Sequence, residues 1–185
     1  MKNLKYVLAG FIFVMGVYFL FNTFIKEEAM PKVKLTTSYG DIVLELDQEN
    51  APISTENFLS YVESGFYNET IVHRVISGFM IQGGDPSGTG HGDYGKYPGY
   101  EFEDELNNQK PYEKGIMAMA NRGPNTNGSQ FFIMHVDYPL PYSYTIFGQV
   151  TEGLDVIDSI AAVQTDAADK PLEDVVIESV EISES

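Results

Sequence analysis

An arginine lies within one of the most apolar runs of the chain, residues 73–85, HRVISGFMIQGGD. The 185 residues contain only two arginines, Arg74 and Arg122. A charge in apolar surroundings is unfavourable unless it has a partner or a task. A second run, residues 115–133, GIMAMANRGPNTNGSQFFI, combines glycines, amides and large apolar residues. The residues of the two runs from which we expect a site are Arg74, Phe79, Met80, Gln82, Asn121, Gln130 and Phe132.

The composition excludes several kinds of catalysis. Cysteine is absent, which removes thiol nucleophiles, disulfides and zinc-thiolate sites. The three histidines, His73, His91 and His135, are not accompanied by carboxylates at metal-ligand spacing, so we expect neither a metal nor a cofactor. Ser129, in NGSQF, lacks the G-x-S-x-G context of a serine hydrolase. Residues 83–93, GGDPSGTGHGD, carry acids where a phosphate-binding loop needs a basic residue or a helix start.

A reaction without a covalent intermediate fits the residues that remain. Rotation about the peptide bond before proline has a barrier of about 18–20 kcal/mol and, unaided, takes roughly tens to hundreds of seconds. The reaction needs no acid, base, nucleophile or metal. It needs an apolar pocket for the proline ring and a donor for the prolyl nitrogen, which gains a lone pair when the amide twists. Arg74 could be that donor, because its hydrogen bond would strengthen only in the twisted state.

The elements that must position these residues are mostly short strands. Apolar and polar residues alternate over 33–47 on both sides of a turn signal at residues 39–41, which predicts a hairpin. Further strands are expected over 70–83, 115–120, 129–136, 144–150 and 175–182, with a long loop over 83–100. Helical spacing predicts helices within 51–67, where Ser54 and Thr55 offer N-cap hydroxyls, and over 154–163. The pattern favours a mainly antiparallel sheet that closes into a barrel.

The N-terminal segment predicts a membrane anchor. Twenty consecutive residues, 6–25, carry no formal charge, and a helix of this length spans about 30 Å of hydrocarbon. Lys2 and Lys5 precede the run, whereas Lys26 is followed at once by two glutamates, which keeps the N-terminus cytoplasmic. We therefore expect a cytoplasmic N-terminus at 1–5, a transmembrane signal anchor at 6–25, a linker at 26–32 and an extracytoplasmic domain at 33–185, as on a bacterial cell surface. Cleavage of the segment and secretion is the alternative.

The charge of the chain is strongly acidic. The whole sequence has a formal net charge of −16 at pH 7, and residues 30–185 hold 8 basic and 25 acidic residues. No basic cluster could neutralise phosphates, so nucleic acid is not expected as a partner. We interpret the acidity, including the EFEDE run at 101–105, as a solvated surface.

The sequence VHRVISGFMIQGGD together with GIMAMANRGPNTNGSQFFI resembles the two signature regions of the cyclophilin family of peptidyl-prolyl cis-trans isomerases. The segments GDIVLELD, TENF, GGDPSGTG, PGYEFEDE and YTIFGQV follow in family order, so the resemblance covers nearly all of residues 33–185. It implies a mainly β fold: a closed eight-stranded antiparallel β-barrel capped by two α-helices, with the active site on an outer face. It also implies proline-containing polypeptides as substrates and a monomeric catalytic domain.

The resemblance also implies roles for individual residues. The residues that would be catalytic are Arg74, Gln82, Asn121 and Phe132. Those that would bind the substrate are His73, Phe79, Met80, Ala120, Gln130, Leu140 and Tyr144. Among these, the apolar side chains would form the proline pocket, and Gln82, Ala120 and Asn121 would contact the substrate backbone. Gln130 would support the arginine.

Three departures from the family pattern qualify the resemblance. Ser77 replaces a proline before Gly78, the tryptophan of many eukaryotic members is missing with Pro139 near its place, and Tyr144 stands where many members have histidine. The missing tryptophan argues against tight cyclosporin binding. A peptide-binding module without significant catalysis is the alternative function, although such a module has no need of the charge of Arg74.

Overall fold

The computed structural model describes residues 30–92, 101–107 and 110–183. Its elements confirm the expected alternation of short strands with two helices. In chain order they are β1 (Lys32–Thr37), β2 (Gly40–Leu46), α2 (Pro52–Glu63), β3 (Thr70–Ile71), β4 (Arg74–Ile76), β5 (Met80–Gly83), β6 (Ile116–Met119), β7 (Phe131–Met134), β8 (Ile146–Glu152), α3 (Leu154–Ala161) and β9 (Val176–Ser183).

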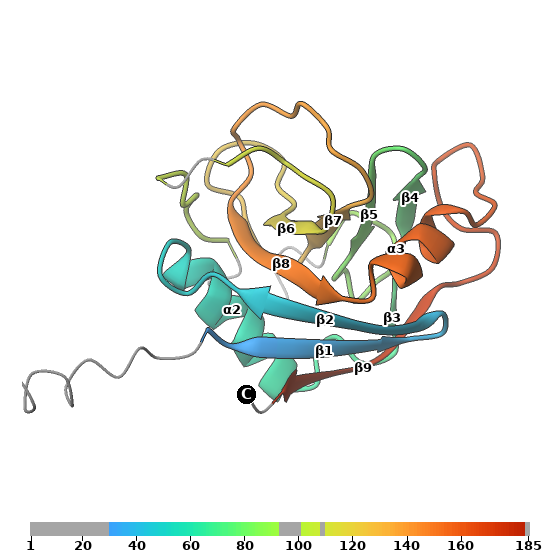
Figure 1. Ribbon diagram of the computed structural model, residues 1–185, viewed down its shortest axis with the longest axis horizontal. Helices are drawn as coiled ribbons and strands as arrows, with labels where there is room; N and C mark the ends of the chain where they lie inside the picture. Colours follow the sequence, from blue (N-terminus) through green and yellow to red (C-terminus); the bar gives the residue numbers. More distant parts are fainter. Residues whose placement is uncertain (1–29, 93–100, 108–109, 184–185) are drawn as a thin grey trace, which may run out of the picture.

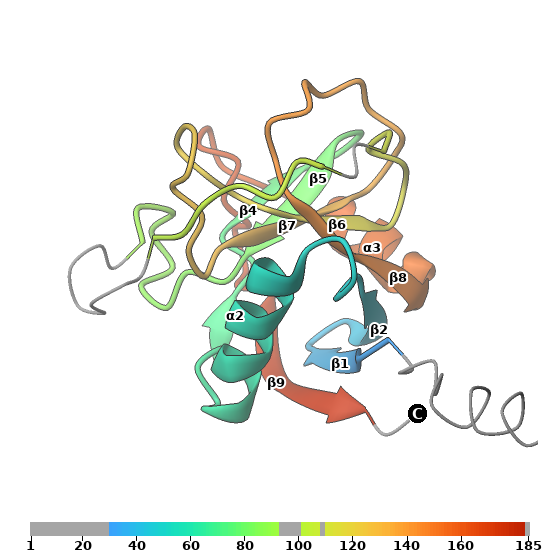
Figure 2. The same cartoon turned by 90° about the vertical axis from the view of Figure 1, so that its left-hand side faces the viewer.

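The described strands form one curled sheet in the order β3-β9-β1-β2-β8-β6-β7-β5-β4, and every pair in it is antiparallel. Figures 1 and 2 show α2 and α3 at opposite ends of this sheet. Strands β1, β2 and β9 make one side of the curl, and β4 to β7 make the other (Figure 1).

The predicted eight-stranded closed barrel needs correction, because the described sheet has nine strands and its ladder is not continuous. The two strands at the ends of the order, β3 and β4, are neighbours in sequence. The Val72 amide, directly after β3, bonds to the carbonyl of Val175, and the Val75 amide, within β4, bonds to that of Asp169. The curl is therefore completed by the chain itself at residues 72–73 rather than by hydrogen bonds between β3 and β4.

No helix among residues 30–92, 101–107 and 110–183 is long and apolar enough to cross a membrane. The predicted anchor at 6–25 lies outside the described residues.

The main core fills the inside of the curl. Alternate residues of β1 and β2 point into it, and so do Phe58 of α2, Phe131 of β7 and Phe147 of β8. The ring of Phe58 packs at 5.0–5.7 Å, between ring centroids, from the rings of Tyr67, Phe131 and Phe147. Each fully buried large apolar side chain contributes about 1.5–3 kcal/mol, so this aromatic centre fixes α2 on the sheet.

A second, smaller apolar cluster lies on the opposite face of β5, β6 and β7. It consists of Met80, Tyr112, Ile116, Ala118, Phe132, Met134 and Ile146. Along β7, Phe131 and Ile133 belong to the main core, whereas Phe132 and Met134 belong to this cluster. Burial on both faces explains why FFIM and IMAM are continuously apolar rather than alternating.

The start of α2 is capped from a distant part of the chain. Its N-cap residue is Ala51, without a side-chain cap, so the predicted capping by Ser54 or Thr55 is wrong. The Glu105 carboxylate instead accepts hydrogen bonds from the amides of Ile53 and Ser54, both at 2.9 Å, and from the Ser54 hydroxyl at 2.7 Å. A carboxylate satisfies the free amides and suits the positive end of the helix dipole. Glu105 of the EFEDE run therefore stabilises the start of α2 and is not only part of a solvated surface.

Candidate active site

Nine of the residues expected in the site line one cavity of about 220 Å³: Arg74, Phe79, Met80, Gln82, Ala120, Asn121, Phe132, Leu140 and Tyr144. The register of the sheet brings Arg74, Gln82 and Phe132 together. Arg74 on β4 pairs with Gln82 on β5, and Gln82 pairs with Phe132 on β7. Directly paired residues on adjacent strands place their Cβ atoms about 5 Å apart. The cation, the amide and the aromatic ring therefore form a row across three strands.

Arg74 stands at the rim of the cavity. Its side chain is 42% exposed, and its Nε lies 3.4 Å from Oδ2 of Asp169, which is equally exposed. Within the part of the chain that the structure describes, this is the one ion pair of Arg74. A long, solvent-exposed pair of this kind is weak. Asp169 therefore constrains the guanidinium only weakly, and no buried carboxylate among the described residues forms an ion pair with it. Nothing in the local sequence around Arg74 signals Asp169, which follows it by 95 residues.

Amide side chains connect the row to the neighbouring loops. Gln82, which lines the cavity, donates from Nε2 to Oε1 of Gln130 at 3.0 Å, and its own Oε1 atom remains an acceptor. Gln130 is buried and donates in turn to the carbonyl of Gly90 at 3.2 Å. Asn121 donates to the carbonyl of Ser143 at 2.9 Å. These bonds fix the amide groups around the cavity, and Gln130 itself stands behind Gln82 rather than in the cavity wall.

The apolar wall of the cavity rests on aromatic contacts. The rings of Phe132 and Tyr144 meet edge to face with centroids 5.4 Å apart. Tyr112 packs beneath them and donates its hydroxyl to the carbonyl of Tyr144 at 2.8 Å. On the other side, the ring of Phe79 packs 4.6 Å from that of Tyr138. An apolar surface of this kind accepts a small ring such as that of proline.

His73 lies behind the cavity, although it was expected to bind the substrate. Its side chain is buried and its ring lies against Gly90. Burial lowers the pKa of His73, and the negative charge of Asp85 opposes this effect only in part. His73 therefore directly precedes Arg74 in the sequence but lies outside the cavity lining, and its burial favours the neutral form of the imidazole.

Asp85, which is not among the predicted site residues, organises the loop after β5. Its fully buried carboxylate accepts hydrogen bonds from the hydroxyl of Ser87 and from the amides of Ser87, Thr89 and Gly90, at 2.7–3.1 Å. Burial disfavours the charge, but the bonds from Ser87 and from the backbone amides outweigh it and hold the pKa of Asp85 below its usual value. In the sequence, this turn is indicated by the close spacing of Asp85, Ser87 and Thr89, residue types that commonly form turns.

Replacement of Asp85 by Asn tests this role through pH. Because the folded-state pKa is lowered, the stabilisation is complete above the unfolded pKa and is lost as the pH falls through the folded one. We expect Asp85→Asn to lower the free energy of unfolding by about 2 kcal/mol at pH 6 and by much less near pH 2. Urea unfolding at both values measures this, with the exposed Asp174→Asn as control. An equal loss at both pH values would contradict the role.

Comparisons with known proteins agree with this geometry. Residues 32–182 match the family model described as cyclophilin type peptidyl-prolyl cis-trans isomerase/CLD. The chain is 44% identical over 153 residues to peptidyl-prolyl cis-trans isomerase CYP18-2 of Arabidopsis thaliana, covering 82% of this chain and 93% of the relative. It is 47% identical over 149 residues to human peptidyl-prolyl cis-trans isomerase-like 1, covering 80% and 89%.

Solved structures show the same relationship. The crystal structure of a cyclophilin type peptidyl-prolyl cis-trans isomerase from Cryptosporidium parvum is 38% identical, covers 84% of this chain and 99% of its own, and gives a TM-score of 0.78. The structure described as the same protein in the presence of the dipeptide Ala-Pro is 39% identical, covers 83% and 99%, and also gives 0.78. Over nearly all of its described residues, this chain therefore belongs to the cyclophilin family and is a peptidyl-prolyl cis-trans isomerase.

Proposed function

We propose that the enzyme lowers the barrier to rotation about X-Pro bonds by binding the proline ring on the apolar wall and donating a hydrogen bond from Arg74 to the prolyl nitrogen. The observation that carries this proposal is the row of Arg74, Gln82 and Phe132 on paired strands, which puts one half-exposed cation on the rim of an apolar cavity. Phe79, Met80 and Phe132 receive the ring, with Phe132 as the floor, and Leu140 and Tyr144 complete the wall.

The energetic basis is a difference between ground and transition states. In the planar amide the nitrogen lone pair is delocalised and accepts poorly; in the twisted amide it is localised and accepts well. A donor placed at that nitrogen therefore binds the transition state better than the substrate and raises the turnover rate. Each gain of about 1.36 kcal/mol corresponds to a tenfold rate increase.

The remaining site residues have binding and supporting roles in this proposal. The Gln82 amide and the backbone at Ala120 and Asn121 bind the peptide backbone on either side of the prolyl bond. Gln130 orients Gln82 through their 3.0 Å hydrogen bond. His73 supports the loop behind the cavity. The Ala-Pro dipeptide named with the Cryptosporidium structure supports a proline-containing ligand for this chain as well.

We further propose that the isomerase works outside the cytoplasm as a monomeric domain, tethered to the membrane through residues 6–25. The uncharged run and the lysines before it support this orientation. The substrates would then be secreted or surface polypeptides whose folding waits for slow X-Pro steps.

The test of the catalytic role replaces Arg74 in the full-length chain. We expect Arg74→Ala to lower kcat/KM in a proline-limited refolding assay about 100-fold, the order of loss seen when one donor to a developing charge is removed. The control variant Lys34→Ala also removes an exposed cation, but one on β1 away from the cavity, and should retain full activity. An Arg74→Ala variant as active as the control would refute the role.

The proposed orientation is tested by protease treatment of intact cells that express the full-length chain. The acidic domain should be digested while a cytoplasmic marker protein stays intact, because the tether places the domain outside. A domain that is protected until the membrane is opened would overturn the extracytoplasmic location, and recovery of the domain in the medium would indicate cleavage instead.

A further inference from the structure

We propose that a second hollow beside the cavity binds a lysine or arginine side chain of the same polypeptide, a few residues from the prolyl bond. This hollow, the tyrosine groove, has a volume of about 440 Å³. Its lining includes Tyr112, Glu113, Asp137, Tyr138, Leu140 and Tyr142. The inference deepens the proposed isomerase function, on which it rests, by naming a substrate class: prolyl bonds with a nearby basic residue.

The tyrosine groove adjoins the cavity of the active site. Leu140 lines both. The ring of Tyr138, in the groove, packs 4.6 Å from that of Phe79, in the cavity. Tyr112 bonds through its hydroxyl to the backbone of Tyr144, so it forms part of the partition between the two. A peptide whose proline occupies the cavity can therefore extend into the groove without leaving the surface.

The walls of the groove offer aromatic faces. Tyr142 stacks on Tyr112 with ring centroids 6.3 Å apart and an interplanar angle of 29°. Tyr138 and Tyr142 are 44% and 48% exposed, which is high for side chains of this size. The apolar stem of a lysine or arginine packs well on such rings, and its cation is attracted to their faces.

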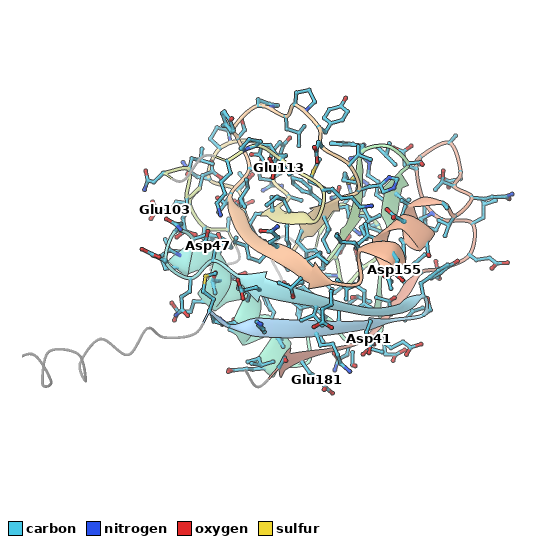
Figure 3. All side chains as sticks on the ribbon, in the orientation of Figure 1. Asp41, Asp47, Glu103, Glu113, Asp155 and Glu181 are labelled. Atoms are coloured by element: carbon cyan, nitrogen blue, oxygen red, sulfur yellow. The ribbon has the colours of Figure 1, made fainter. Side chains whose placement is uncertain are left out.

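The lining of the groove carries negative charge. Glu113 and Asp137 are both exposed groove residues, and Figure 3 shows Glu113 on the side of the molecule where the segment between β7 and β8 arches over the sheet. Oδ1 of Asp137 is fixed by the amide of Lys114 at 2.8 Å. The Lys114 ammonium bonds to Asp158 at 2.6 Å instead of to Asp137. Among the residues that the structure describes, no cation forms an ion pair with Glu113 or Asp137.

This combination selects a basic side chain over the alternatives. Two carboxylates within an acidic protein repel an acidic or phosphorylated segment, and they raise the local concentration of cations. A purely apolar side chain would use the rings but would be indifferent to Glu113 and Asp137. The response to removing those two charges therefore separates a basic from an apolar occupant.

The experiment measures kcat/KM of the full-length enzyme on Ala-Pro peptides in which Lys, Leu, Ala or Glu is placed at each of three positions before and after the bond. At one or two positions we expect Lys to exceed Ala about five- to tenfold, through a lower KM, and Glu to fall below Ala. This Lys preference should shrink in about 1 M salt, where charge interactions are screened.

The matched variant is Glu113→Gln with Asp137→Asn, which preserves the shapes and the acceptor for Lys114. In this double variant, the ratio of kcat/KM for Lys peptides to kcat/KM for Ala peptides should drop to about one. The control Glu173→Gln, which lies outside the groove, should leave this ratio unchanged. Because a ratio is measured, partial loss of folded enzyme does not affect the result.

The outcomes are separable. Equal kcat/KM for Lys, Leu, Ala and Glu at every position would overturn the groove inference while leaving the isomerase intact. A preference for Leu over Lys that survives the double variant would also overturn it, in favour of an apolar subsite. No turnover of any peptide would refute the proposed function itself.

Discussion

The site depends on the strict alternation of side chains along two short strands, β5 and β7. Ile81, Phe131 and Ile133 face the main core, whereas Met80, Gln82 and Phe132 face the cavity. A slip of one residue in the pairing of β5 with β7 would bury Gln82 in the core and expose Ile81, which is strongly unfavourable. The same apolar burial that stabilises the fold therefore fixes Arg74, Gln82 and Phe132 in one row, and the chemistry follows from that register.

Support for the row comes from groups that do not touch the cavity. The buried carboxylate of Asp85 holds the loop that presents the Gly90 carbonyl, this carbonyl accepts from Gln130, and Gln130 accepts from Gln82. Tyr112 supports the apolar side in the same way through the backbone of Tyr144. The proposed mechanism uses no acid, base or covalent intermediate and therefore relies on such pre-organisation, because its rate enhancement would come from the position of groups that are already charged or polar.

The sequence was informative where the interactions are local. Alternation and helical spacing predicted the hairpin, the two helices and the strands, and the two glycine-rich runs contain most residues of the cavity lining. Long-range partners were not predictable. Glu105 caps a helix 51–52 residues away, Asp169 meets Arg74 across 95 residues, and the break of the ladder at residues 72–73 depends on contacts with the C-terminal segment. None of these leaves a periodic or short-spaced signal, because each depends on how the sheet curls.

In the proposed mechanism, Arg74 acts on the twisted amide and not on substrate binding. Exchange NMR on an Ala-Pro peptide at saturating enzyme separates the two, since it reports the cis-trans rate within the complex while titration gives Kd. For Arg74→Ala we expect a Kd within about threefold of that of the native enzyme and an on-enzyme cis-trans rate lower by about 100-fold. An unchanged on-enzyme rate, with the loss confined to Kd, would contradict this mechanism.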